Sequence, residues 1–451
     1  MQFLIPFIRS KICSALYFYT LLLSTISIAE ASQTLSIYGS NTIGSSLAPA
    51  LAEGLLKQKG FTHLESQSLQ QSNQQIITAG LTALKNDARI HIHSQGSSTG
   101  FVALHEKRGD IAASSRPIKE SEARLLSPQG DMHSKSAEHV IAIDGLAIIV
   151  HPDNPINDLS ITQLADIFSG EITDWSMLGA HSGPIRIYAR DHNSGTWETF
   201  KELVLTPSDK VLSSQAKRFE SSEQLADLVS KDIKAIGFIG LPYVRQAKAL
   251  AVSTGEALAM YPTAELIATE DYPLSRRLYL YSTEHQNNPL AQEFLLFAQS
   301  DAGQRLVESN GFISQTVSAM SVVADDSMPV QYQQLAQQAQ RLSVNFRFKQ
   351  GSAELDNKAL RDIDRVLAYL RKHNKMKNKL VLVGFGDSKS DPERARLLSK
   401  LRAMAVRRQL HNNEIIFRDI IGIGDAMPVA SNNLDQGRVK NRRVELWVYS
   451  L

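Results

Sequence analysis

Residues 190–197 read RDHNSGTW, a run in which Arg190 is followed four residues later by Ser194, Gly195 and Thr196. The residues before it, IRIYAR, have the pattern of a β-strand, and those after it begin a helical pattern. Hydroxyl groups, free backbone amides and a guanidinium are the groups that bind an oxyanion when it leaves water. We therefore interpret this strand-to-helix turn as an anion-binding element.

Three further stretches have the same character: GSNTIG at 39–44, QGSSTG at 95–100 and GDIAASSRPI at 109–118. They supply Thr42, Ser97, Ser115 and Arg116 at the ends of predicted strands. Each one alone is as well explained by helix capping, which favours glycine and hydroxyl side chains at such junctions. Four in one chain, two of them with arginine, favour a shared anion site. GSNTIG is not followed by GK[ST], so it is not a nucleotide phosphate loop.

Short apolar runs alternate with helical patterns between residues 35 and 320, which indicates an α/β region with a mostly parallel sheet. His91 and His93 alternate with isoleucine on one of these strands, the spacing of a metal pair. No third ligand lies near them in the sequence, so we prefer a half-buried strand and expect no metal and no cofactor. Residues 325–341 are polar and rich in glutamine; their aspartates and proline mark a boundary, and the tract after it predicts a short helix or a semi-rigid spacer. A compact α+β pattern follows.

The two parts of the chain carry opposite charge. The sequence has 451 residues, and its last part, from Arg341 onward, holds 23 Lys and Arg against 12 Asp and Glu. The remainder holds 25 basic against 34 acidic residues. This asymmetry suggests two modules with different partners. The basic residues are spread through helix and strand patterns without stacking aromatics, and this argues against nucleic-acid binding.

The N-terminal residues predict a secretory signal peptide over 1–31. Arg9 and Lys11 precede an apolar run at 12–28, and Ala29-Glu30-Ala31 has the pattern of a cleavage site. A membrane anchor is the alternative, but three hydroxyl residues dilute the run. The single cysteine, Cys13, falls inside this segment, so the mature chain is expected to lack disulfides.

With these motifs in order, residues 35–320 resemble the periplasmic phosphate-binding proteins that serve ABC transporters. The R-x-x-x-S-G-T match at 190–196 is the most specific part, and AIGFIGLPYV at 235–244 is similar to a strand near that family's hinge. The resemblance implies a fold of two lobes that close on the ligand. It implies ligand contacts from Thr42, Ile43 through its amide, Ser97, Arg190, Ser194, Gly195 and Thr196. Many relatives have an aspartate where Ser115 stands, followed here by Arg116, so phosphate selectivity stays open.

In the basic part, Asp387 ends a predicted strand, and Arg402 lies on a largely apolar stripe of the next helix. An arginine in that position needs an acidic partner or an anionic ligand, and the residues alone leave both open. FKQGSAEL, GFGD, LSKLRAMAV, GIGDAMPV and NRRVEL resemble the OmpA-type domain that binds peptidoglycan. The resemblance implies that Asp387 and Arg402 hold the diamino acid of the wall peptide. The family's GHTD motif reads GFGD here, and its asparagine before the LS pair is Ala395.

The sequence thus predicts a two-lobed periplasmic-binding-protein fold of type II over 32–323, a linker over 324–342 and a separate α+β OmpA-like domain over 343–451. We expect a non-enzymatic periplasmic protein that binds phosphate or a similar oxyanion and is attached to the cell wall. The sequence leaves open an association with the outer membrane and an ABC permease as partner. The alternatives are a structural or adhesion protein with a vestigial anion site and, less favoured, a phosphate-ester hydrolase.

Overall fold

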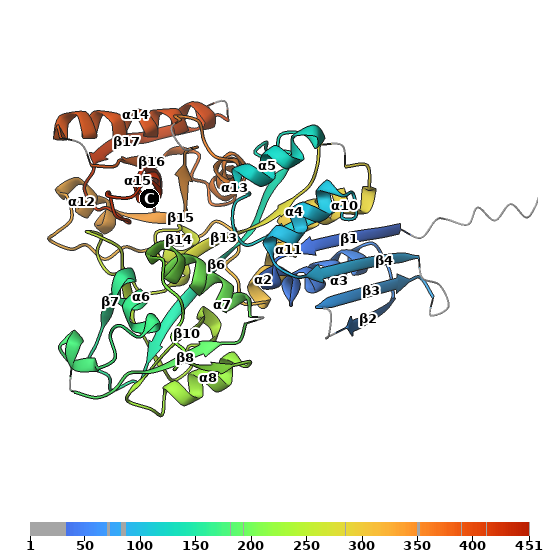
Figure 1. Cartoon of the computed structure of the whole chain (residues 1–451). Helices are drawn as coiled ribbons and strands as arrows, with labels where there is room; N and C mark the ends of the chain where they lie inside the picture. Colours follow the sequence, from blue (N-terminus) through green and yellow to red (C-terminus); the bar gives the residue numbers. More distant parts are fainter. Residues whose placement is uncertain are drawn as a thin grey trace, which may run out of the picture.

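The computed structural model describes residues 33–69, 73–82, 87–180, 182–192, 194–284, 286–349, 352–388, 390–411 and 413–450. The predicted signal peptide, 1–31, lies outside the described residues. The chain forms two lobes and a C-terminal module that lies against them (Figure 1). None of the described helices combines the length and the hydropathy that crossing a bilayer requires.

The first lobe is built around one end of a long mixed sheet. The sequence of strand β4 alternates as a half-buried strand should: Ile90 and Ile92 point into the lobe's core, whereas Arg89 is exposed. Its strands are β1 (Gln33–Gly39), β2 (His63–Leu69), β3 (Gln74–Gly80), β4 (Ala88–Ser94) and β5 (Ile111–Ser114). Its helices are α2 (Asn41–Gly44), α3 (Leu47–Gln58), α4 (Ser97–His105), α5 (Glu120–Leu126), α10 (Pro289–Gln299) and α11 (Asp301–Ser309), with the 3-10 turn η2 (Ser127–Gln129).

The second lobe packs around a cluster of aromatic side chains. The rings of Phe200 and Phe238 stack at 4.0 Å, and Phe168 packs against both. Its strands are β7 (Asp158–Ser160), β8 (Arg186–Arg190), β9 (Lys217–Phe219), β10 (Ala235–Gly240), β11 (Lys248–Ala249) and β12 (Ala251–Ser253). Its helices are α6 (Ile161–Ser169), α7 (Gly195–Phe200), α8 (Ser222–Val229) and α9 (Ala264–Ala268), with η3 (Trp175–Leu178), η4 (Lys201–Leu205), η5 (Thr206–Ser208) and η6 (Leu241–Tyr243).

Two antiparallel strands, β6 (Glu138–Val150) and β13 (Ser275–Tyr281), connect the lobes (Figure 1). The sheet order is β2-β3-β4-β1-β5-β13-β6-β10-β8-β9, with β11 also paired to β6. The expectation of a mostly parallel sheet is wrong, because β13 and β6 pair antiparallel with each other and with β5 and β10. Chain reversal at the lobe boundary requires this arrangement, since β6 enters the second lobe and β13 returns from it.

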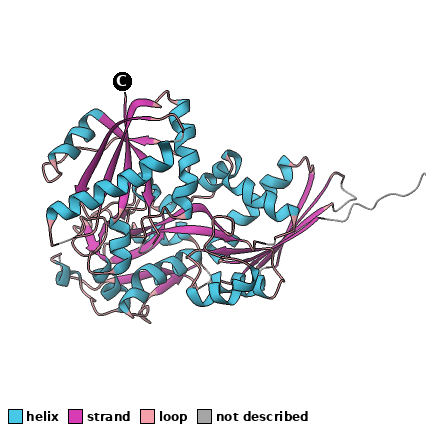
Figure 2. Ribbon diagram, turned by 90° about the horizontal axis from the view of Figure 1, so that it is seen from above, coloured by secondary structure: helices cyan, strands magenta, loops and turns pink. Residues whose placement is uncertain are grey.

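The C-terminal module is an α+β domain whose sheet has the order β14-β15-β18-β16-β17. Its side chains form one core on each face of the sheet. Helix α13 buries Ile363, Val366 and Leu370, the apolar stripe expected from the sequence. Its elements are β14 (Ala319–Met320), α12 (Val330–Gln338), β15 (Ala339–Arg347), α13 (Asn357–Lys372), β16 (Lys377–Phe385), α14 (Pro392–His411), β17 (Ile416–Gly424), α15 (Asp435–Asn441) and β18 (Arg443–Tyr449). The module lies far from the β2–β3 edge of the first lobe (Figures 1 and 2).

The range 324–342, for which the sequence predicts a linker, contains α12 and the first residues of β15. Tyr332 and Leu335 of α12 pack on Trp447 in the core of the C-terminal module. The preceding strand β14 already pairs with β15. This part of the chain therefore belongs to the folded C-terminal module and does not form a free spacer.

Candidate functional site

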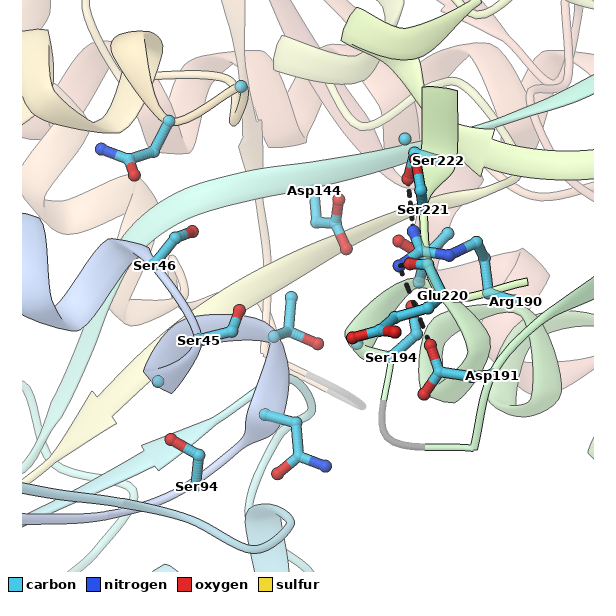
Figure 3. Close-up of a pocket in the computed structure, with 18 of the residues that line it drawn as sticks. Ser45, Ser46, Ser94, Asp144, Arg190, Asp191, Ser194, Glu220, Ser221 and Ser222 are labelled. Atoms are coloured by element: carbon cyan, nitrogen blue, oxygen red, sulfur yellow. Dashed lines mark hydrogen bonds and ion pairs between the residues drawn. The ribbon is translucent and has the colours of Figure 1, made fainter. Parts of the chain in front are cut away.

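A cavity of about 920 Å³ lies between the two lobes, a size typical of small-ligand sites. We call it the interlobe pocket. Serine side chains of the first lobe, Ser45, Ser46 and Ser94, lie across it from Arg190 and Ser194 (Figure 3). Its lining includes Thr42, Ser45, Ser46, Ser94, Asp144, Arg190, Asp191, Ser194, Gly195, Thr196, Glu220, Ser221, Ser222, Glu223 and Tyr243. Thr42, Arg190, Ser194, Gly195 and Thr196, all expected from the sequence, thus line one cavity.

The two lobes touch at Thr42 and Gly195. Ser40 caps the short helix α2, its Oγ accepting from the amide of Thr42 at 3.2 Å, and this fixes Thr42 at the start of the helix. A Cβ atom on Gly195 would lie 2.4 Å from Thr42 Oγ1. Only glycine allows this approach. The side chain of Ile43 packs in the core of the first lobe, and the residue does not line the pocket.

Arg276, on the crossing strand β13, bonds to both residues of this contact. Its Nη2 donates to Thr42 Oγ1 at 2.7 Å and to the carbonyl of Gly195 at 3.1 Å. Its Nε faces Asp144 Oδ2 at 3.3 Å, and its Nη1 faces Glu202 at 3.1 Å. The arginine is almost fully buried. The sequence gives no signal for Arg276 or Asp144, because a single charged residue in a strand pattern does not indicate such a role.

Arg190 lies on the wall of the pocket opposite α2 and is held by the loop that begins α8 (Figure 3). Its Nε donates to the carbonyl of Phe219 at 3.2 Å, its Nη2 to the carbonyl of Glu220 at 2.6 Å, and its Nη1 to Ser222 Oγ. Burial lowers the pKa of Arg190, although nearby carboxylates oppose the shift. Two backbone carbonyls and the hydroxyl of Ser222 therefore position the guanidinium at the cavity.

Carboxylates outnumber cationic groups in the pocket lining. Asp144, Asp191, Glu220 and Glu223 line it, whereas Arg190 is the one guanidinium among the described lining residues. Deeper in the interlobe contact, Glu198 Oε2 is buried and has no hydrogen-bond partner within the described structure. Burial raises the pKa of this carboxyl, although Arg276 opposes the shift. Binding of an anion here must depend on directed hydrogen bonds rather than on net positive charge.

Ser97, Ser115 and Arg116 do not line the interlobe pocket. The hydroxyl oxygens of Ser97 and Ser115 lie 3.2 Å apart, and both residues are buried in the first lobe. Arg116 makes a two-pronged ion pair with Glu122, at 2.9 and 2.7 Å. The structure thus places Ser97 and Ser115 together and gives Arg116 a structural partner, which the sequence alone did not identify. His93, the second residue of the histidine pair, stacks on Tyr38 at 4.0 Å.

In the C-terminal module, Asp387 lies between two arginines. Arg442 donates to both of its oxygens, at 3.0 and 2.8 Å, and Arg402 Nη2 lies 3.8 Å from Oδ1. Asp387 is 1% exposed, so the pair predicted from the sequence forms a recessed ionic site. Arg442 belongs to the NRRVEL motif, and the sequence alone did not indicate that it pairs with Asp387. Phe385, at the position of the family's histidine, is fully buried, and the guanidinium of Arg443 lies 3.9 Å from the centre of its ring.

Comparison with known proteins identifies both parts of the chain. Residues 65–302, more than half of the chain, match the PBP superfamily domain, and residues 347–442 match the OmpA family. The phosphate-binding protein PstS of Pseudomonas aeruginosa strain PAO1 is 31% identical over 244 residues, which are 50% of this chain and 74% of that protein. The phosphate-binding protein PstS of Borreliella burgdorferi is 28% identical over 235 residues, 51% of this chain and 81% of that protein. These matches confirm both resemblances.

Among solved structures, an ABC-type phosphate transport receptor from Vibrio cholerae is 26% identical and covers 62% of this chain and 99% of its own, with a TM-score of 0.48. PstS from Borrelia burgdorferi is also 26% identical, covers 62% of this chain and 98% of its own, and has a TM-score of 0.46. These relatives are named as binding or transport proteins, not as enzymes.

Proposed function

This chain belongs to the PBP superfamily, and on that basis we propose that its two lobes bind phosphate, or another tetrahedral oxyanion that carries a proton, without transforming it. One observation carries the proposal: Thr42 of the first lobe and Arg190, Ser194, Gly195 and Thr196 of the second line the same cavity. A guanidinium, three hydroxyls and a helix start can replace the water shell of such an anion.

The carboxylates of the lining support a preference for a protonated anion. A carboxylate accepts the hydrogen of hydrogen phosphate but repels sulfate, which has no proton at neutral pH. Asp144, Asp191 and Glu220 supply such acceptors around the cavity. These carboxylates can therefore favour hydrogen phosphate over sulfate even though serine stands at position 115, where many relatives have aspartate.

Titration calorimetry with sodium phosphate tests the site. Arg190→Ala should weaken phosphate binding by about 2–5 kcal/mol, because it removes a partly buried, hydrogen-bonded charge from the pocket wall. Arg186→Ala is the matched control, since Arg186 lies on the same strand but pairs with Asp232 at 2.9 Å and is exposed. Sodium sulfate should give little heat. If neither anion binds to the unaltered protein, the site is vestigial, and the structural alternative takes the place of the binding proposal.

We further propose that the C-terminal module attaches the protein to peptidoglycan in the periplasm. Its match to the OmpA family and the recessed site formed by Asp387, Arg402 and Arg442 support this. A wall-attached protein holds its anion close to one place, so it fits a local store or sensor, and a permease would have to lie within its reach. Co-sedimentation with purified sacculi measures the attachment. If the unaltered protein sediments no more than the Asp387→Ala variant, the proposed attachment is wrong.

A further inference from the structure

The C-terminal module is bound to the second lobe through a buried ionic cluster around Asp271. Asp271 follows α9 and is 1% exposed. It accepts from Arg341 at 2.6 Å, from Asn345 at 2.9 Å and from Arg347 at 3.2 Å, three residues of β15 that face the second lobe. Buried charges are tolerated only where their partners stay in place. This contact therefore fixes the second lobe to the C-terminal module.

The same module also holds the first lobe. Arg361 of α13 donates to the carbonyl of Glu138, where β6 begins, at 2.7 Å. Arg365 donates to Gln315 Oε1 at 2.9 Å, and Asn357 donates to Glu138 Oε1 at 3.1 Å. These acceptors lie on the first-lobe side of the crossing strands, next to the start of β6 and beyond α11. The C-terminal module thus contacts both lobes (Figure 1).

The contacts span the point where the lobes join. Arg277 lies on the crossing strand β13, in register with Ile143 of β6. Its side chain pairs with Glu270 of the second lobe at 2.9 Å and with Asp356 of the C-terminal module at 2.8 Å. Lobe closure in a two-lobed receptor is a rotation about such crossing strands. A body that is bonded to both sides of this axis restricts that rotation.

A passive tether would look different. It would need a flexible linker and few contacts between the modules, as independent domains have. Here β14, which directly follows the first lobe, is already part of the C-terminal sheet. The buried ion pairs would also lose their partners if the module moved as a whole, which costs several kcal/mol per ion.

We propose that the C-terminal module is a clamp across the hinge, which keeps Thr42 and Gly195 in contact and thereby sets the affinity of the interlobe pocket for its anion. The last step rests on the proposed function, whereas the mechanical step does not. A receptor whose binding-competent state is only partly populated binds its ligand more weakly in proportion to that population. Release of the clamp should therefore weaken binding without a change in the pocket lining.

The test uses the full chain with Cys13→Ser and two new cysteines, Lys57→Cys in the first lobe and Lys231→Cys in the second, both exposed. Spin labels at these positions report the interlobe distance by double electron–electron resonance. The clamp variant is Arg361→Ser with Arg365→Ser, which leaves the pocket and the Asp271 cluster intact. The control is Arg407→Ser, because Arg407 is an exposed arginine of α14.

The unaltered protein should give one narrow distance distribution without phosphate. The clamp variant should add a second population, and its dissociation constant for phosphate should rise about fivefold or more. Equal distributions in the clamp variant and the control would overturn the inference. If the unaltered protein binds no phosphate, the proposed function fails, but the distance measurement still decides on the clamp.

Three further variants guard against misfolding of the double variant and test the clamp from its other side. Arg361→Ser and Arg365→Ser are also made as single variants. They replace the double variant if its circular dichroism spectrum shows that it is unfolded. Glu256→Ala weakens the clamp from the second-lobe side, where Glu256 Oε1 accepts from the amide of Asn432 at 2.7 Å. A clamp predicts a shift in the same direction from either side, whereas local damage to the first lobe does not.

Discussion

Arg341 of the C-terminal module donates to Asp271 of the second lobe over 2.6 Å, and both side chains are almost completely buried. They lie 70 residues apart in the sequence, and each belongs to a part of the chain with opposite net charge. The cationic groups around Asp271 outweigh its burial and hold its pKa well below the usual range of an aspartate. The carboxylate is therefore ionised at neutral pH, where it acts as the counter-ion of these arginines.

Asp271→Asn should consequently destabilise the whole protein. The substitution leaves Arg341 and its neighbouring arginines buried without their counter-ion, and such losses cost about 3–5 kcal/mol. Chemical denaturation followed by circular dichroism measures the effect. The control is Asp227→Asn, because Asp227 pairs with Arg245 at 3.4 Å on the surface, and exposed pairs contribute only about 0–1 kcal/mol. Equal stabilities for the two variants would contradict a structural role of the cluster.

Protonation of His139 should weaken the contact between the modules as the pH falls. Burial lowers the pKa of His139 to about 4, and Arg361 adds to the shift. The other groups that face the ring are Gln299 of α10 and the carbonyl of Ser136. Since the unfolded chain takes up the proton near pH 6.5, stability from the neutral ring is complete above that pH and is lost between pH 6.5 and 4.

The melting temperature measured from pH 7.5 to 4.5 checks this dependence. His139→Gln should flatten the profile over that window, because glutamine does not titrate. His133→Gln is the control, since it also removes one imidazole, but from an exposed position beside Glu120. A profile that keeps its slope in His139→Gln would assign the pH dependence to other groups.

Gly195→Ala should block the contact of the lobes. The added methyl group would lie 2.4 Å from Thr42 Oγ1 and 2.5 Å from its Cα, so the lobes would have to separate. We expect phosphate affinity, measured by calorimetry, to fall at least about tenfold, which corresponds to about 1.4 kcal/mol. Gly183→Ala is the control in the same lobe, since the nearest atom to its added carbon is Lys234 Cε at 3.5 Å. Unchanged affinity in Gly195→Ala would show that binding does not require this contact.

Local signals in the sequence predicted most elements of the fold and five of the residues that line the interlobe pocket. The R-x-x-x-SGT run predicts its strand-to-helix turn because the turn depends on the conformational preferences of these neighbouring residues. Arg276 could not be found in this way, since its partners Asp144 and Thr42 lie 132 and 234 residues away. The docking of the modules was likewise hidden. The opposite charges of the two parts suggested separate partners, whereas some of those charges, such as Arg341 and Asp271, satisfy each other.

The two arginines at Asp387 should differ in what they contribute to wall binding. Arg442 uses its fork on both oxygens of Asp387, so it orients the carboxylate. Arg402 is held less firmly. Its Nη2 lies 3.8 Å from Asp387 Oδ1, and its Nη1 makes a long hydrogen bond of 3.5 Å to the carbonyl of Phe385. We therefore expect the Arg402 guanidinium to bind a carboxylate of the wall peptide, and Asp387 to bind its ammonium group.

Arg402→Ala should accordingly abolish co-sedimentation with purified sacculi, because it removes the group proposed to contact the peptide. Arg442→Lys keeps the charge but loses the two-pronged bond, and retention should fall only in part. Arg418→Ala is a control, since Arg418 stacks on Tyr449 at 3.9 Å, away from Asp387. If Arg442→Lys reduces sedimentation as much as Arg402→Ala, both arginines hold the peptide, and the division of roles between them is wrong.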